Sequence, residues 1–166
     1  QVDKPAAHAE FACGDHLAEG RALNALNATE TDLAARLRGF QQAAEAMEQG
    51  GGTALAARSN HADVFSALGL YRRGQRLIRA AGDEARRLGL NQLLATGLTN
   101  GAGRACLYGD LVNARRLLAE YEALLQVYAD PRAAWNLAYL RGHLALSEGR
   151  ATQAVRVIGS VIGLSP

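Results

Sequence analysis

The chain has 166 residues (17.6 kDa), of which 49% are hydrophobic, 20% are charged and 5% are aromatic. This balance excludes the disordered and fibrous classes and suits one ordinary domain or a short array of repeats. No apolar stretch approaches the ~18 residues of a membrane-spanning helix, and 18 basic against 16 acidic side chains lack the excess of a dedicated nucleic-acid-binding protein. Neither a membrane nor a nucleic acid is therefore expected as a partner.

Cysteine and histidine give no sign of a disulfide framework or a metal site. Cys13 and Cys106 are too few and too far apart in the sequence for either, which suits a reducing compartment and predicts a cytoplasmic protein. His8, Cys13 and His16 form the only tight cluster of metal-type ligands, but structural zinc needs four. We expect no metal and no cofactor.

Internal repetition with a step of 40 residues dominates the chain. It is carried by glycines, small residues and arginines, namely Gly69, Gly109 and Gly149; Ala22, Ala62, Ala102 and Gly142; Ala34, Gly74, Ala114 and Ala154; and Arg36, Arg76, Arg116 and Arg156. Between them, apolar residues recur every three or four positions, which is the helical period. Each unit of 40 residues is therefore predicted to contain two helices.

Taken in chain order, the pattern predicts four pairs of helices. The first helices are expected near 15–27, 53–68, 91–107 and 132–147, and the second near 30–48, 71–88, 111–128 and 151–162, in repeats of approximately 13–50, 53–89, 91–130 and 132–163. Within a pair, a glycine such as Gly109 can take the left-handed conformation that ends a helix. Between pairs, the breaks fall at Gly50 to Gly52, at Gly89, and at Asp130 and Pro131.

Small residues recur twelve positions apart, one on each helix of a pair. They are Ala62 and Gly74, Ala102 and Ala114, and Gly142 and Ala154. Small side chains let two crossing helices approach closely, with larger side chains above and below. The same crossing repeated in every pair predicts that the pairs stack on one another.

One run of residues carries a resemblance to a known family. Ala102, the turn Gly109-Asp110-Leu111, Ala114, Leu118 and Tyr121 follow the pattern of the tetratricopeptide repeat, which this chain resembles over residues 53–162 and less over 13–50, where Thr29 replaces the turn glycine. The 40-residue period is similar to that of large bacterial LuxR-type and MalT-like transcriptional regulators. The resemblance implies an all-α fold, a right-handed solenoid of about four antiparallel hairpins.

Both ends of the array lack the polar outer face that terminal repeats need. The last helix, from Val155 to Leu164, is mostly apolar, and the chain opens at Gln1 without an initiator methionine. We expect the chain to be an excerpt of a longer protein and to self-associate through its uncapped ends.

Catalytic motifs are missing from the sequence. It contains no G-x-S-x-G, no phosphate-binding loop, no H-E-x-x-H and no glycine fingerprint after a strand, and Gly101 and Gly103 fall inside a predicted helix. His61 and His143 have no serine or cysteine nucleophile that the sequence pairs with them, and Cys106 is expected to be a buried, inert thiol. The chain is not expected to be an enzyme.

The resemblance implies a binding groove lined by the first helices. Carried over position by position, the groove residues are Ser59, Asn60, Asp63 and Ser66; Thr96, Thr99, Asn100 and Gly103; and Asn136, Tyr139 and His143. Asn60 and Asn100 resemble asparagines that hold peptide backbone in chaperone-binding members. Asp63, Asn136 and Leu140 stand where that group has cations, so an acidic C-terminal tail is not the expected ligand. Tyr139 either anchors a ligand or packs between repeats.

Three functions follow as hypotheses. The first is a protein-binding or effector-binding module of a bacterial signalling or transcriptional regulator, in which a ligand shifts the population of two states. The second is a passive scaffold for protein interaction. The third is RNA binding through the arginines at 36, 76, 116 and 156, although the interleaved Glu84 and Glu120 favour a solvated, ion-paired surface there.

Overall fold

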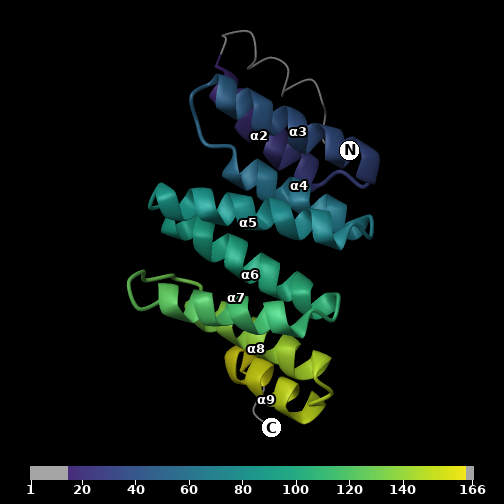
Figure 1. The fold of residues 1–166 in the computed structure, drawn as a ribbon, viewed down its shortest axis with the longest axis vertical. Helices are drawn as coiled ribbons and strands as arrows, with labels where there is room; N and C mark the ends of the chain where they lie inside the picture. Colours follow the sequence, from purple (N-terminus) through teal and green to yellow (C-terminus); the bar gives the residue numbers. More distant parts are fainter. Residues whose placement is uncertain (1–14, 164–166) are drawn as a thin grey trace. The chain divides into compact units, whose positions relative to one another are not determined.

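The structure, a computed structural model, describes residues 15–163, and this part of the chain contains helices and no strand (Figure 1). The helices are α2 (His16–Ala28), α3 (Leu33–Gln49), α4 (Leu55–Ala67), α5 (Tyr71–Arg87), α6 (Asn91–Leu107), α7 (Leu111–Leu124), α8 (Ala133–Ser147) and α9 (Ala151–Ile162). The prediction of an all-α fold is confirmed. Within the described range, no helix is long and apolar enough to cross a membrane.

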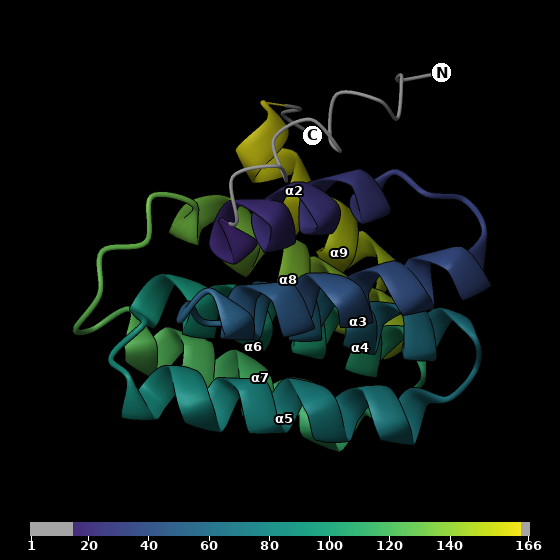
Figure 2. The same cartoon turned by 90° about the horizontal axis from the view of Figure 1, so that it is seen from above.

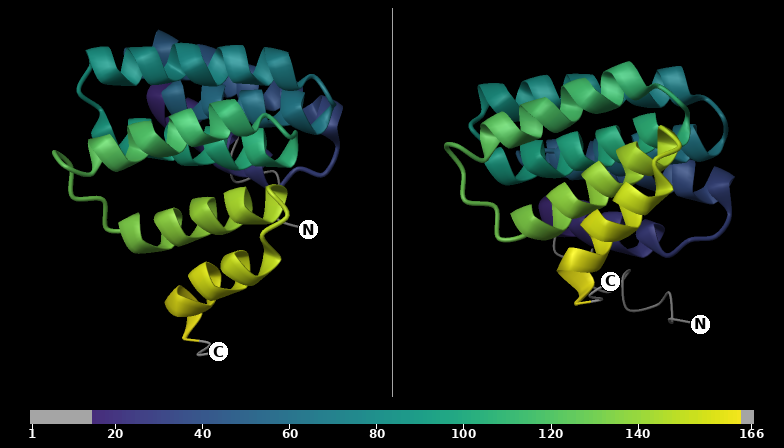
Figure 3. Two further views of the ribbon diagram at one scale, coloured as in Figure 1. Left: turned by 60° about the horizontal axis from the view of Figure 1, so that its bottom comes forward. Right: turned by 90° about the horizontal axis from the view of Figure 1, so that it is seen from below.

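The chain forms two compact units, residues 1–84 and 85–166, and the boundary falls within α5. In the first unit, α3 packs against both α2 and α4 (Figure 2). In the second unit, α6 packs against α7 and α8, and α8 packs against α7 and α9. Figure 3 shows α9 folding back from α8 after a tight turn. Consecutive helices therefore pair as hairpins, and the second unit holds two of them.

The turns inside three hairpins have the same hydrogen bonds. Gly69, Gly109 and Gly149 have φ of 78°, 72° and 76°, the left-handed conformation that glycine adopts without strain. At the middle one, the Gly109 N–H donates to Cys106 O (3.1 Å) and the Asp110 N–H donates to Ala105 O (2.8 Å). The equivalent two bonds occur at Gly69 and Gly149, so each helix ends in a Schellman motif. The predicted turn glycines are confirmed.

The small residues lie where the helices of these hairpins cross. A Cβ atom on Gly74 would stand 2.7 Å from Ala62 O, and one on Gly142 would stand 2.5 Å from Ile158 Cγ1. Ala102 and Ala114, the corresponding pair of α6 and α7, are both buried. The close approach predicted from the spacing of twelve is therefore present at Ala62 and Gly74, while a Cβ atom on Gly142 would stand at the ordinary contact distance of 3.7 Å from Ala154 O.

The first hairpin crosses differently. Ala34, which continues the 40-residue series, is exposed, and the close approach occurs at Gly20 instead. A Cβ atom on Gly20 would stand 2.8 Å from Ala43 O and 2.6 Å from Met47 Cγ. The turn also lacks a glycine, because Thr29 closes α2 with its N–H and its hydroxyl on Leu26 O. Residues 15–50 thus keep the hairpin without the turn glycine and with a different crossing point.

Two helix ends differ from those expected from the sequence. α3 begins at Leu33 rather than near residue 30, because Asp32 caps it by accepting from Ala34 N and Ala35 N. α7 ends at Leu124 rather than near residue 128. There the Gln126 and Val127 N–H groups donate three residues back, to Ala123 O and Leu124 O, so the chain leaves the helix in a tighter turn before Pro131.

Candidate functional site

In the second unit, α6 and α8 lie side by side with their chains in register. An Arg132 guanidinium nitrogen donates to Thr96 Oγ1 at 3.3 Å. About two turns further along both helices, a Cβ atom on Gly103 would stand 3.2 Å from Tyr139 Oη. Both contacts join positions 36 apart, so α6 and α8 run parallel and present one shared surface.

Aromatic side chains follow one face of α8 at intervals of four residues. Trp135 is 50% exposed, Tyr139 is 38% exposed and His143 is half-buried. The rings of Tyr139 and His143 are in contact, with centroids 4.4 Å apart and planes tilted by 50°. Residues four apart lie on the same side of a helix, so these three rings form a continuous stripe, called the α8 stripe below.

Beside the α8 stripe, α6 contributes two threonines and an asparagine that the sequence predicted for the groove. Thr96 Oγ1 donates to Gln92 O at 3.0 Å, and Thr99 Oγ1 donates to Thr96 O at 3.1 Å. Both hydroxyl groups therefore satisfy backbone carbonyls of their own helix, and Thr99 is buried. Asn100 is exposed. Of the three, Asn100 offers the most accessible polar group to a ligand.

The structure places Asn136 in a polar network below the start of α8. Tyr121 Oη donates to Asp130 Oδ2 at 2.5 Å, Asn136 Nδ2 reaches both of these atoms at 3.1 Å, and the Arg132 N–H donates to Asp130 Oδ1 at 2.9 Å. Burial alone would raise the pKa of Asp130, but these hydrogen bonds and the charge of Arg132 outweigh it and lower the pKa. Burial, then the bond to Asp130, raises the pKa of Tyr121 to about 12. The Asn136 amide is thus engaged in holding the turn before α8.

The remaining predicted groove residues lie in the first unit. Ser59, Asn60 and Asp63 are half-buried on α4, and Ser66 is buried, donating to Ala62 O at 3.2 Å. Asn60 Nδ2 donates to Asn24 Oδ1 of α2 at 3.0 Å, again across 36 residues. These residues belong to a different unit from the α8 stripe, and Asn60 already has an amide partner.

His61 on α4 is packed against aromatic and cationic neighbours. Its ring centroid lies 4.9 Å from that of Phe65, and the Arg73 guanidinium carbon lies 4.2 Å from the Phe65 centroid. Burial, and then the charge of Arg73, lower the pKa of His61. This arrangement favours the neutral imidazole and gives His61 a packing role.

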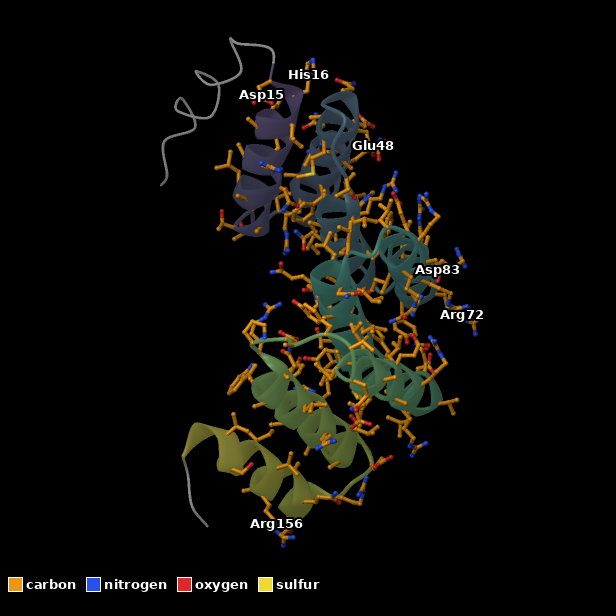
Figure 4. All side chains as sticks on the ribbon, turned by 90° about the vertical axis from the view of Figure 1, so that its left-hand side faces the viewer. Asp15, His16, Glu48, Arg72, Asp83 and Arg156 are labelled. Carbon is orange, nitrogen blue, oxygen red and sulfur yellow. The ribbon has the colours of Figure 1, made fainter. Side chains whose placement is uncertain are left out.

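Many arginines on the second helices are paired with glutamates. Arg86 and Arg116 both bind Glu120, Arg115 binds Glu148, and Arg58 of α4 bridges Glu48 of α3 and Glu84 of α5. The side chains of Arg72 and Arg156 point away from the helices that carry them (Figure 4). Of the arginines at 36, 76, 116 and 156, Arg116 is held by a glutamate, which disfavours phosphate binding at that position.

Three residues of the α6 and α8 surface were not identified from the sequence. Trp135 continues the spacing of Tyr139 and His143, and that interval of four was the available signal. Arg132 is exposed at the start of α8. Burial lowers the pKa of Arg104 to about 10, while Tyr139 and Tyr108 act in the opposite direction, so Arg104 stays a cation at neutral pH.

A second feature lies between α2 and α3. It is an open depression of about 420 Å³ lined by His16, Glu19, Leu23, Gln42, Glu45, Ala46 and Gln49. Its carboxylates already have partners, since His16 Nδ1 lies 3.2 Å from Glu19 Oε2 and Gln41 Nε2 donates to Glu45 Oε1 at 3.0 Å. His8 and Cys13, grouped with His16 in the sequence, lie outside the described residues. The α6 and α8 surface is therefore the stronger candidate site.

No family model, no curated protein and no solved structure matches the chain. The relationship to tetratricopeptide repeats stays a prediction from the sequence.

Proposed function

We propose that the chain is a non-catalytic binding module built as a tetratricopeptide-like, right-handed solenoid of helix hairpins. Three hairpin turns with the same two hydrogen bonds, at intervals of 40 residues, support a repeated unit. Contacts between first helices also have the same separation in sequence. Asn24 and Asn60 in one unit are 36 residues apart, as are Thr96 and Arg132 in the other. Equal separations are expected when successive hairpins stack by one repeated geometry.

The proposed ligand site is the α6–α8 face, formed by Thr96, Asn100, Arg132, Trp135, Tyr139 and His143. The observation that carries the proposal is the pair of exposed rings of α8, Trp135 and Tyr139, together with the exposed amide of Asn100. Asn100 lies about one turn before Gly103, the α6 residue that faces Tyr139. Large aromatic side chains are enriched in protein interfaces because they bury much area with few rotatable bonds. An exposed amide can both donate to and accept from a peptide group. A peptide segment of a partner protein suits both features.

Such binding would act without covalent chemistry. In a signalling or transcriptional regulator of the LuxR or MalT type, a ligand that favours one arrangement of the hairpins would shift the population toward it. A passive scaffold would bind through the same face with no change of state. Both roles need the α6–α8 face and neither needs a cofactor.

A random peptide library displayed on phage tests the binding function directly. Trp135 is the only tryptophan of the chain, so its fluorescence reports on the α6–α8 face alone. Selected peptides should change that fluorescence, and Tyr139→Ala should weaken their binding about tenfold or more by removing an exposed anchor. Arg116→Ala, on the paired surface of α7, is the matched control and should leave affinity unchanged. Failure to select any peptide, or binding that depends on Arg116 and not on Tyr139, would contradict the proposal.

Sedimentation analysis separates the sensing role from the scaffold role. The protein is examined with and without a saturating selected peptide. A ligand-dependent change in self-association supports sensing, because only a ligand that binds two states differently can shift them. An unchanged association state with full binding supports the scaffold.

A further inference from the structure

Charge is distributed unequally between the two units. Residues 1–84 contain nine basic and eleven acidic side chains, whereas residues 85–166 contain nine basic and five acidic ones. The near balance of the whole chain therefore combines a net charge of −2 in the first unit with +4 in the second. The unit that carries the α6–α8 face favours an anionic partner.

The excess of positive charge includes the α6–α8 face itself. Neither α6 nor α8 contains an aspartate or a glutamate, while Arg132 is exposed beside Trp135 and Arg104 is a half-buried cation beside Tyr139. The five carboxylates of the second unit lie on α7 or at helix ends, and each already accepts a hydrogen bond: Asp110 from Asn113, Glu120 from Arg86, Glu122 from Arg141, Asp130 from Tyr121 and Glu148 from Arg115. Arg132 Nε lies 4.0 Å from Asp130 Oδ1, but the Asp130 side chain is only 2% exposed while that of Arg132 is 56% exposed. An acidic ligand on this face would therefore meet the exposed side of Arg132, with the Asp130 carboxylate buried behind it.

The spacing of the α8 stripe matches that of an extended peptide. Trp135, Tyr139 and His143 are four residues apart, which is a rise of about 6 Å per step along a helix. Alternate side chains of an extended chain point the same way about 6.7 Å apart. A peptide running along α8 can place every second side chain against a successive ring. The side chains between them then point toward the arginines or the solvent.

We propose that the α6–α8 face binds an extended peptide in which apolar residues alternate with acidic ones. This deepens the proposed peptide-binding function and rests on it. The apolar side chains cover Trp135 and Tyr139, Asn100 bonds a peptide group, and the acidic side chains interact with Arg132 directly and with Arg104 at longer range. A single-stranded nucleic acid fits less well, because Tyr139 and His143 are tilted by 50° in mutual contact and leave no parallel rings for a base to enter between them.

Three peptides of about eight residues test the inference, with leucine alternating with glutamate, serine or lysine and with both termini blocked. Blocked termini remove any contribution from a free C-terminal carboxylate. Binding is measured by the fluorescence of Trp135. The glutamate peptide should bind about tenfold more tightly than the serine peptide, and the lysine peptide should bind more weakly still. Raising the salt concentration should reduce this difference.

Two variants with equal change of charge locate the effect. Arg132 and Arg115 have 56% and 55% of their side chains exposed, and each pairs with a carboxylate, Arg132 with Asp130 and Arg115 with Glu148. They differ in place, because Arg132 lies at the start of α8 and Arg115 lies on α7. Arg132→Gln should weaken binding of the glutamate peptide about threefold, the size expected for one exposed charge pair, and leave binding of the serine peptide unchanged. Arg115→Gln should change the affinity for neither peptide. Equal effects of the two substitutions would overturn the assignment to the α6–α8 face.

The other outcomes are equally informative. Equal affinity for the three peptides would overturn the acidic preference while leaving peptide binding in place. No binding by any of them, with peptides of other patterns selected from the library, would overturn this inference alone. Tighter binding of a short oligouridylate than of the glutamate peptide, lost in Tyr139→Ala, would replace it with a nucleic-acid site.

Discussion

Within each unit, the first helices of two hairpins are in contact through residues 36 apart in the sequence. The exposure of the side chains beside that contact differs between the units. In the first unit, Asn60 Nδ2 donates to Asn24 Oδ1, so each of the two amides uses one of its polar atoms within the protein. In the second, Tyr139 lies over Gly103 and keeps 38% of its side chain exposed, with Trp135 exposed one turn away. Contacts of the same sequence separation thus accompany a bonded amide pair in one unit and exposed rings in the other.

The crossing points of the hairpins give the largest expected difference between the units. Gly74→Ala places a methyl group 2.7 Å from the backbone atom Ala62 O and 2.6 Å from Ser66 Oγ, so the helices must separate. We expect a loss of about 3 kcal/mol in the free energy of unfolding, measured by chemical denaturation. Gly142→Ala meets the Ile158 side chain instead. That side chain can change rotamer. The better helix propensity of alanine also offsets about 1 kcal/mol of the loss in the free energy of unfolding.

A surface glycine provides the control for this pair. Gly97 on α6 has open space around the position of a Cβ atom, so Gly97→Ala should stabilise the protein slightly through helix propensity alone. Equal destabilisation by Gly74→Ala and Gly142→Ala would contradict the distinction between a backbone and a side-chain obstacle.

The buried network of the second unit is expected to have the next largest effect. Tyr121→Phe removes the hydroxyl that donates to Asp130 and accepts from Asn136, leaving a buried carboxylate with fewer donors. We expect a loss of about 2 kcal/mol at neutral pH, measured by urea denaturation.

Two pH windows identify the cause of that loss. The folded-state pKa of Asp130 is lowered, so its contribution is present above the unfolded value of about 4 and is lost as the pH falls below it. The pKa of Tyr121 is raised to about 12, so its contribution is present below the unfolded value of about 10 and is lost as the pH rises toward 12. The advantage of the wild type over Tyr121→Phe should shrink in both windows. A constant difference across the whole pH range would contradict the role of these two groups.

The repeated elements could be predicted from the sequence because each depends on local chemistry. Gly109 needs a left-handed conformation, and Ala102 and Ala114 need close approach, so both leave a residue type at a fixed position. The first hairpin could not be predicted in this way. Its crossing moved to Gly20 and Ala43, which no 40-residue interval marks, because any small residue at the contact serves equally well.

The candidate site was harder to predict because exposure depends on neighbours far along the chain. Asn136 and Asn100 look equivalent in sequence, but Asn136 meets Tyr121 and Asp130, while Asn100 meets solvent. The charge of the α6–α8 face was also hidden, since the balanced total conceals opposite excesses in the two units. Arg132 could be placed beside Thr96 only once α6 and α8 were in register.

Asparagine replacements in the two units should give the smallest effects and the clearest contrast. Asn60→Ala leaves Asn24 Oδ1 without its donor at a half-buried position, so the free energy of unfolding should fall by about 1 kcal/mol. Asn100→Ala removes an exposed amide, so stability should change by less than about 0.5 kcal/mol while affinity for a selected peptide falls. Urea denaturation and Trp135 fluorescence measure the two quantities on the same samples. Loss of affinity in Asn60→Ala, or loss of stability without loss of affinity in Asn100→Ala, would mean that the units do not divide packing and binding in this way.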